Sequence, residues 1–309
     1  MKVLLVIDGS PYSQMITGML RALKLPCETQ VIVMTVVPEH KFLGGLSFSL
    51  LRSRGSEQSE RQTREREHAV ELVESAIREL GNTELELKRL VRWGNTAEEI
   101  LKAAAEEEVS LILIGAKGLT GSSQFTIGSV AQKVIRYTTA NVLMVRKKTT
   151  AISQVLIAID GSKYSEIATQ FLLQLPLPDS KIMLVAAVQS YSEALSKIPT
   201  LDLRTNPELI SILRDSEEKA AQDIITRFST QLSQGGYQVS SSIMHGGAAE
   251  SILKVAKENS PDLIVIGAKG LTGIKSFLLG NVAEKVAANS ECSVLICRAS
   301  INKGQRVSK

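Results

Sequence analysis

The residues with the clearest chemical potential lie in the glycine-punctuated segment "GAKGLTGSSQFTIGSV", which begins at Gly115. Two residues separate Gly115 from Gly118, nine more precede Gly128, and Ser129 follows directly. Glycine lets the backbone come close to a ligand, and the free N–H groups at the start of a helix suit an anion. The spacing therefore predicts a phosphate cradle, provided that a strand precedes the segment and a helix follows it.

A closely similar sequence, "GAKGLTGIKSFLLGNV", occurs at 267–282, an offset of 152 residues. The same offset relates "VIDGS" to "AIDGS", "RWGNTAEEIL" to "MHGGAAESIL", and "NVLMVR" to "SVLICR". One constant offset across four blocks indicates a duplicated domain rather than a short structural repeat. A chain of 309 residues is long enough for two domains, and we place them at 1–148 and 153–299.

Within each copy, apolar runs alternate with amphipathic segments, which predicts strands joined by helices. In the first copy the expected strands lie at 2–7, 29–37, 85–93, 110–115 and 141–146. Their continuous apolar character indicates burial on both faces. The expected fold class is therefore α/β, with two tandem doubly wound (Rossmann-like) domains. Each would contain a five-stranded parallel sheet with helices on both faces.

Two helix starts and two long connections complete the pattern. Ser10 with Pro11 predicts the start of the first helix, and Asn95 is placed to cap a helix from Thr96. The connections at 38–57 and 189–207 show no sequence similarity to each other. Long connections of this kind are either functional lids or disordered, and the sequence leaves both alternatives open. Residues 299–309 form a basic tail that we expect to be mobile.

An acidic residue joins the glycines at the expected site. Open parallel sheets bind ligands beyond the carboxyl ends of their strands. Asp8 ends the first strand and Val36 lies near the end of the second, with Asp160 and Val188 taken as their counterparts. The alternative is structural, because strand-to-helix glycines often serve packing and Asp-Gly-Ser is a good turn signal. From the residues alone, nucleotide binding and a purely structural role remain about equally favoured.

Several other functions lack the residues that they require. The chain has neither a P-loop G-x-x-x-x-G-K-[ST] nor a G-x-G-x-x-G after the first strand. It also lacks a G-x-S-x-G elbow and a Cys/His nucleophile pair, and Asp8 is the only acid near the cradle. His245 ends a strand, and we expect it to be structural rather than a metal ligand. Cys292 and Cys297 are expected to face opposite sides of one strand and not to pair.

Bulk composition restricts the partners further. A formal net charge of +4 is too small to indicate nucleic-acid binding. No apolar run reaches the roughly 20 residues of a membrane span, and the N-terminal apolar run is too short for a signal peptide. The three cysteines have no metal-type spacing, which is typical of a reducing cytoplasm.

The motifs "IDGS", "GAKGLTGSSQFTIGSVAQKV" and "NVLMVR", in this order, resemble the universal stress protein family over essentially all of both halves. The resemblance is to the ATP-binding branch, whose signature is Gly, two residues, Gly, nine residues, Gly-Ser/Thr. It implies ATP, often with Mg2+, bound through Asp8 and Val36 at the adenine side and through the glycines and Ser129 at the phosphates. The second copy departs at one position, because Asn281 stands where the family has Ser or Thr.

Together, the residues and the resemblance give one set of candidate nucleotide-binding positions in each half. They are Asp8, Val36, Gly115, Lys117, Gly118, Gly128, Ser129 and Val130, and Asp160, Val188, Gly267, Lys269, Gly270, Gly280, Asn281 and Val282. No residue is assigned a catalytic or metal-binding role.

The function expected from this set is an ATP-binding regulatory protein of the stress response, with slow or no hydrolysis. Two alternatives stay open: a nucleotide-free protein-interaction module, and an enzyme of the adenine-nucleotide hydrolase type. Family resemblance also implies an internal pseudo-dimer through the final strands, with a homodimer and a regulatory protein partner as further possibilities.

Overall fold

The computed structural model of the chain describes residues 1–38, 55–81, 84–117, 127–177, 179–188, 207–270 and 279–299. The two long connections, for which the sequence leaves a lid and disorder open, lie largely outside this part, as do Gly118 and the tail from residue 300 onward. The described strands form one sheet in the order β3-β2-β1-β4-β5-β10-β9-β6-β7-β8. Their bounds are β1 (Lys2–Val6), β2 (Gln30–Pro38), β3 (Glu86–Gly94), β4 (Leu111–Gly115), β5 (Asn141–Val145), β6 (Gln154–Ile159), β7 (Lys181–Val188), β8 (Gln238–His245), β9 (Leu263–Gly267) and β10 (Ser293–Cys297).

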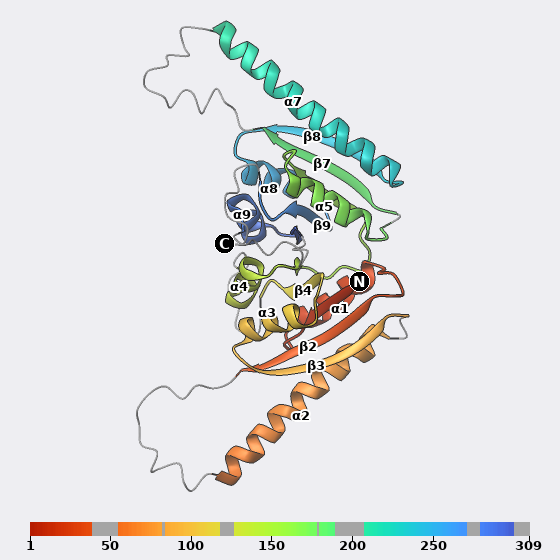
Figure 1. Ribbon diagram of the computed structural model, residues 1–309, viewed down its shortest axis with the longest axis vertical. Helices are drawn as coiled ribbons and strands as arrows, with labels where there is room; N and C mark the ends of the chain where they lie inside the picture. The colour runs from red at the N-terminus through yellow and green to blue at the C-terminus, as the bar shows by residue number, and fades with distance from the viewer. Residues whose placement is uncertain are drawn as a thin grey trace, which may run out of the picture.

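Each half has five parallel strands, as predicted, and the two halves are fused into one sheet. The fusion is an antiparallel pairing of β5 with β10, in which Leu143 lies opposite Leu295. These two leucines are separated by the repeat offset of 152 residues, so a pseudo-two-fold axis passes between them. The predicted internal pseudo-dimer is confirmed, and Figure 1 shows its halves stacked along the long axis with α2 and α7 at opposite ends.

Helices cover both faces of the sheet. Leu5 belongs to the core on one face and Leu4 to the core on the other, because neighbouring strand residues point to opposite sides. One face carries α1 (Pro11–Ala22), α2 (Gly55–Leu80), α5 (Lys163–Leu173) and α7 (Pro207–Gln234). The other carries α3 (Thr96–Glu106), α4 (Ser129–Tyr137), α8 (Ala248–Asn259) and α9 (Asn281–Asn289). The predicted doubly wound α/β class is thus observed in both halves.

The predicted helix starts differ in how their side chains are used. Asn95 caps α3, since its side-chain oxygen accepts a hydrogen bond from Glu98 N at 3.3 Å. Ser10 is the N-cap residue of α1 and Pro11 follows it, but the Ser10 hydroxyl makes no capping bond. The hydroxyl oxygen of Ser10 is buried and has no hydrogen-bond partner. At this helix the proline and the preceding turn, rather than the serine side chain, define the start.

The cysteines lie where the strand pattern puts them. Cys297 packs in the core on the α1 face and Cys292 in the core on the α3 face. Neither is in a disulfide, which confirms that they do not pair. Cys27 is exposed, and its thiol donates a hydrogen bond to Glu84 Oε2 at 2.6 Å.

We expect Cys27 alone to react with a thiol reagent in the folded protein, and all three cysteines to react after unfolding. Hydrogen bonding to the Glu84 carboxylate raises the pKa of the Cys27 thiol, so the reactive thiolate is scarce near pH 8. Replacing Glu84 by Gln removes the negative charge and should increase the labelling rate at this pH. Timed alkylation followed by intact mass measurement tests both statements. Rapid labelling of two cysteines before unfolding would contradict the buried placement.

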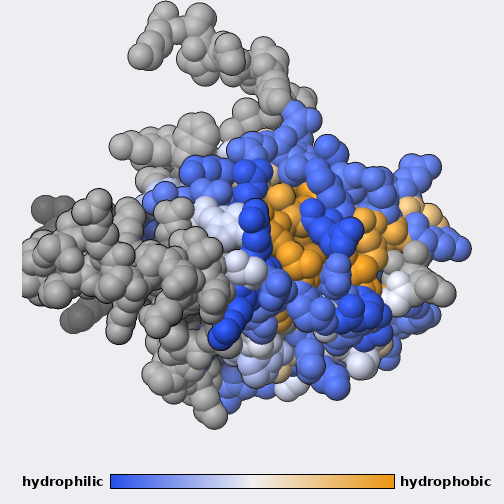
Figure 2. Space-filling view, turned by 90° about the horizontal axis from the view of Figure 1, so that it is seen from below, coloured by the Kyte–Doolittle hydropathy of each residue, from blue (hydrophilic) through white to orange (hydrophobic). Residues whose placement is uncertain are grey.

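The lower end of the molecule in Figure 1 presents apolar side chains among polar ones, as Figure 2 shows. Helix α2 and the edge strand β3 lie at this end, where Leu87 and Val91 are half-buried and Val70 is 38% exposed. No helix in the described part of the chain is both long and apolar enough to cross a membrane.

Candidate functional site

The turn after β1 uses one oxygen of its aspartate to start the first helix. Asp8 Oδ1 accepts a hydrogen bond from Ser10 N at 3.0 Å. In the second half, Asp160 Oδ1 accepts from Ser162 N at 2.9 Å and from the Ser165 hydroxyl at 2.6 Å. The structural interpretation of Asp-Gly-Ser therefore holds for Oδ1 in both halves. It leaves Oδ2 of each carboxylate outside the turn.

The second oxygen of Asp160 faces the glycine segment. A Cβ atom added to Gly270 would lie 2.7 Å from Asp160 Oδ2, with no other heavy atom of the described chain closer. Any side chain at this position would require the Asp160 carboxylate to shift, since real Cβ atoms keep a larger separation. The structure thus brings Asp160 and Gly270 together, as the sequence predicts. Gly118, the counterpart of Gly270, lies outside the described residues.

The first glycine of each segment has a packing role. A Cβ atom on Gly115 would come within 2.8 Å of Tyr12 Cβ, and one on Gly267 within 2.7 Å of Tyr164 Cβ. These tyrosines lie in the first turns of α1 and α5, which cross the ends of β4 and β9. At both positions, glycine allows the end of the strand to lie close to a helix of the same half. This supports the packing alternative for Gly115 and Gly267.

The last glycine closes the segment back onto the sheet. Gly128 N donates to Ala116 O at 2.7 Å, and Gly280 N donates to Ala268 O at 2.7 Å. Helix α4 consequently begins beside the end of β4, and α9 beside the end of β9. Both helices lack a side-chain cap at their N-cap glycine. Among the described residues, no side chain caps the first N–H groups of these helices, and such groups can bind an external acceptor.

One lysine in each half adds a positive charge to this region. Lys117 is only 9% exposed and Lys269 only 8% exposed, which is unusual for lysine. Within the part of the chain that the structure describes, neither ammonium has a hydrogen-bond or ion-pair partner. The low exposure is that of the whole side chain, because neither ammonium nitrogen is among the buried polar atoms without a partner. Each lysine therefore places a positive charge where a bound anion would pair with it.

The residues at the helix starts are accessible. Ser129 and Asn281, the first helical residues of α4 and α9, are exposed. Val130 is half-buried and Val282 is 36% exposed. Glu284 lies in the first turn of α9, whereas α4 has no acidic residue in its first turn. The two sites therefore differ in charge as well as at the Ser/Asn position.

The two valines chosen from the sequence are not equivalent. Val3 pairs with Val31 in the first half, and Val155 pairs with Ile182 in the second, so β7 is offset from β2 by 151 residues and not by 152. A one-residue shift moves a side chain to the other side of the sheet. Val36 packs on the α3 face, whereas Val188 is one position out of step with the β7 residues that pack on that face.

The structural counterpart of Val36 is Ala187, and the pairing of Val36 with Val188 was wrong. A one-residue deletion between β6 and β7 is the cause.

The sequence does not reveal the partners of the last side chain of the third strand in each half. His245 Nε2 lies 3.3 Å from Glu218 Oε2, and in the first half Arg66 stacks over Trp93 with its guanidinium carbon 5.0 Å from the ring centroid. Both contacts join equivalent positions on the long helix and the edge strand. A histidine that pairs with one acid is consistent with the structural role predicted for it.

The junction between the halves also contains residues that motif analysis passed over. Arg146 Nη2 donates to Ala287 O at 2.6 Å and to Ala288 O at 3.0 Å, at the end of α9. Arg298, at the equivalent position, donates to Ile135 O near the end of α4. Each half thus caps the last helix of the other. The arginine that ends both "NVLMVR" and "SVLICR" was the sequence feature from which these contacts could have been suspected.

These features define a class of protein: a tandem of doubly wound α/β domains fused through their last strands, with a glycine segment and a buried lysine at each switch point. A model of the universal stress protein family matches residues 1–146 and residues 152–298. The chain therefore belongs to the universal stress protein family, with two family domains in tandem.

Individual relatives agree with this arrangement. Universal stress protein YxiE of Bacillus subtilis is 29% identical over 146 residues, which is 47% of this chain and 99% of that protein. Universal stress protein MJ0577 of Methanocaldococcus jannaschii is 28% identical over 154 residues, 48% of this chain and 95% of that protein. Each of these relatives thus corresponds to about half of the chain.

One solved structure matches nearly the full length. A universal stress protein from Archaeoglobus fulgidus superimposes with a TM-score of 0.65 at 20% identity, covering 96% of this chain and 98% of that one. At this identity the likeness concerns the fold, and it extends to both halves.

Proposed function

We propose that the protein is a stress-response regulator that binds ATP at the switch point of its first half and hydrolyses it slowly or not at all. Membership of the family supports a role in the stress response. The observation that carries nucleotide binding is Lys117, which lies two residues beyond the end of β4, is 9% exposed and has no counter-charge in the described part of the chain. The uncapped start of α4 returns to this same point.

The residues present fit a nucleoside phosphate. The N–H groups at the start of α4, the Ser129 hydroxyl and the Lys117 ammonium would hold the phosphates. Asp8 and Val36 lie at the ends of β1 and β2, where the adenosine end would be placed. Among the described residues, no group of three His, Cys, Asp or Glu side chains is placed to hold a metal ion. We propose that Mg2+ enters together with the phosphates.

Binding, rather than turnover, is favoured by the side chains around the cradle. Asp8 is the acid next to the first site, and its Oδ1 is already engaged by the turn. Only Oδ2 remains for a ligand, which suits hydrogen bonding to a sugar or base better than activation of water. We place this regulator in the cytoplasm.

The second half offers a weaker version of the same site. Asn281 replaces the hydroxyl of Ser129, and the carboxylate of Glu284 lies in the first turn of α9. A negative charge at a helix start opposes a bound phosphate, although Glu284 forms an ion pair with Arg136 of α4. We therefore propose that ATP fills the first site at concentrations that leave the second largely empty.

Exchanging the one residue that differs between the signatures tests this proposal. Isothermal titration with ATP and Mg2+ should show one strong site per chain. Ser129→Asn should weaken it about tenfold, because a hydrogen bond to a charged group is lost or lengthened. Asn281→Ser should create a second measurable site. A wild-type chain that binds no ATP at millimolar concentration, or a strong site that responds to Asn281→Ser and not to Ser129→Asn, would overturn the proposal.

A further inference from the structure

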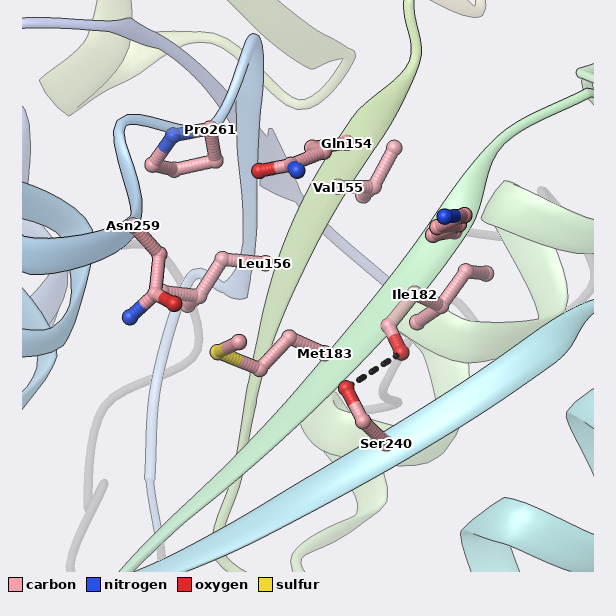
Figure 3. A pocket seen from close by; sticks show the side chains of 9 residues that line it. Gln154, Val155, Leu156, Ile182, Met183, Ser240, Asn259 and Pro261 are labelled. Atoms are coloured by element: carbon pink, nitrogen blue, oxygen red, sulfur yellow. Dashed lines mark hydrogen bonds between the residues drawn. The ribbon is translucent and has the colours of Figure 1, made fainter.

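A cavity lies at the edge of the second half opposite the carboxyl ends of its strands. Its volume is about 120 Å³, close to four water molecules at about 30 Å³ each. The floor is apolar, formed by Leu156 of β6 and Met183 of β7, and Pro261 adds an apolar wall (Figure 3). Polar side chains at its margin come from the starts of the strands and from the last residue of α8.

The first half contains an ion pair at the equivalent place. Lys88 Nζ lies 2.7 Å from Glu107 Oε1 and 2.9 Å from Oε2, joining β3 to the end of α3. The residues at the same repeat positions are Ser240 and Asn259, and both line the cavity. The second half therefore lacks a lysine side chain, with its alkyl stem and terminal ammonium, where the first half has one.

The groups that surround the cavity retain the acceptors that an ammonium requires. Asn259 Nδ2 donates to Val255 O at 2.9 Å, which directs Oδ1 away from that carbonyl, and Figure 3 shows this oxygen on the cavity side. The Ser240 hydroxyl donates to Ile182 O at 3.4 Å, so its lone pairs stay available. An ammonium has three donors and no acceptor.

Lys181 is the only charged residue among the described residues that line the cavity, and a helix dipole acts in the opposite direction. Asn259 ends α8, and the negative end of the helix dipole favours a cation there. Lys181, which is exposed, also lines the cavity and opposes a cation. In the first half its register counterpart is the neutral Gln30. An exposed charge is well hydrated, so we expect it to weaken a cationic ligand modestly and not to exclude it.

We propose that this cavity binds a primary ammonium on a short alkyl chain, which takes the place that Lys88 occupies in the first half. The alkyl chain would lie on Leu156 and Met183, and the ammonium would meet Asn259 Oδ1 and Ser240 Oγ. The site is distinct from the glycine segments and does not depend on nucleotide binding. A ligand of about five non-hydrogen atoms in a partly open cavity is expected to bind with a millimolar dissociation constant.

The test uses the full chain labelled with 15N and titrated with n-butylammonium chloride against sodium chloride of equal ionic strength. The side-chain amide of Asn259 and the backbone amide of Ser240 should shift saturably. Sodium butyrate should give no saturable shift at these positions. No saturable response to n-butylammonium, or a response to butyrate alone, would overturn the proposal.

Two variants test whether the ligand binds because the second half lacks the lysine that the first half has at this place. Ser240→Lys combined with Asn259→Glu rebuilds the ion pair of the first half. The variant should abolish the saturable shifts at the backbone amides of Leu156 and Met183, which line the cavity and are unchanged, while the rest of the spectrum stays folded. Lys181→Gln should tighten binding roughly threefold by removing the like charge. Retention of n-butylammonium binding by the rebuilt pair, or weaker binding by Lys181→Gln, would contradict the assigned place and charge of the ligand.

Discussion

Replacing Gly267 by Ala is expected to lower the free energy of unfolding by about 2–3 kcal/mol, the upper part of the range for overpacking a well-filled interior. The added Cβ would lie 2.7 Å from Tyr164 Cβ and 2.8 Å from both the carbonyl carbon and the carbonyl oxygen of Tyr164. Because two of these atoms belong to the backbone of α5, no rotation of a side chain can relieve the contact. The helix would have to move away from the end of β9. Urea unfolding at constant temperature measures the change.

A matched control adds the same methyl group at a glycine where the crowding is milder. In Gly18→Ala the new Cβ lies 3.3 Å from Thr149 O, with no second close contact. Alanine is also favoured over glycine inside a helix by about 1 kcal/mol, which offsets the mild crowding. We expect Gly18→Ala to stay within about 1 kcal/mol of the wild type. Equal stability of Gly267→Ala and the wild type would show that the first glycine is not required for packing.

This pair of variants also separates two uses of glycine that the sequence presents as one motif. Gly115 and Gly267 lie against the first helix of their own half, whereas Gly270 lies against the carboxylate of Asp160. A motif gives spacing, and spacing does not reveal which neighbour requires the missing side chain. We therefore expect the first glycine of each segment to matter for stability and the later ones for the ligand.

The parts of the fold that follow from local patterns were predictable. Apolar strands alternating with helices define the doubly wound class, and the constant offset defines the duplication. The pairing of Val36 with Val188 failed because a single deletion in the loop before β7 leaves no mark in the motifs on either side. Register is decided by which face each side chain buries, and that information is spread over the whole strand.

Besides the register of β7, the sequence did not predict which charged side chains are buried. Lys117 and Lys269 were proposed from their position beside the glycines, but that position did not predict their low exposure. The reciprocal contacts of Arg146 and Arg298 are still less visible, because each reaches residues about 140 to 160 positions away. Long-range contacts of this kind emerge only once the two halves are joined.

The second large effect concerns Arg146 and Arg298. Replacing either arginine should destabilise a helix in the other half of the chain. Arg298 is 8% exposed, and its guanidinium donates to Ile135 O in α4. Burial lowers the pKa of this guanidinium from its ordinary value, yet the group stays charged at neutral pH. Arg298→Met keeps the length of the apolar stem but leaves a helix carbonyl without its donor. The expected loss is about 2–3 kcal/mol, typical of a hydrogen bond to a charged group.

Amide hydrogen exchange locates that loss. In Arg298→Met, protection should fall by roughly 30-fold or more at the end of α4, in the half that does not contain the substitution. Arg146→Met should instead expose the end of α9, where Ala287 and Ala288 lose their common donor. Lys102→Met, which breaks an exposed ion pair with Glu99 inside α3, serves as the control and should change neither helix.

The crossed pattern distinguishes an interface from ordinary local packing. If each arginine stabilised mainly its own half, Arg298→Met would loosen α9 and Arg146→Met would loosen α4, which would contradict the reciprocal capping seen here. If the pattern is crossed, each half depends on the other for the last turn of the helix that begins at its own glycine segment. Neither half would then keep its site fully ordered alone, which gives a physical reason for joining the two domains in one chain.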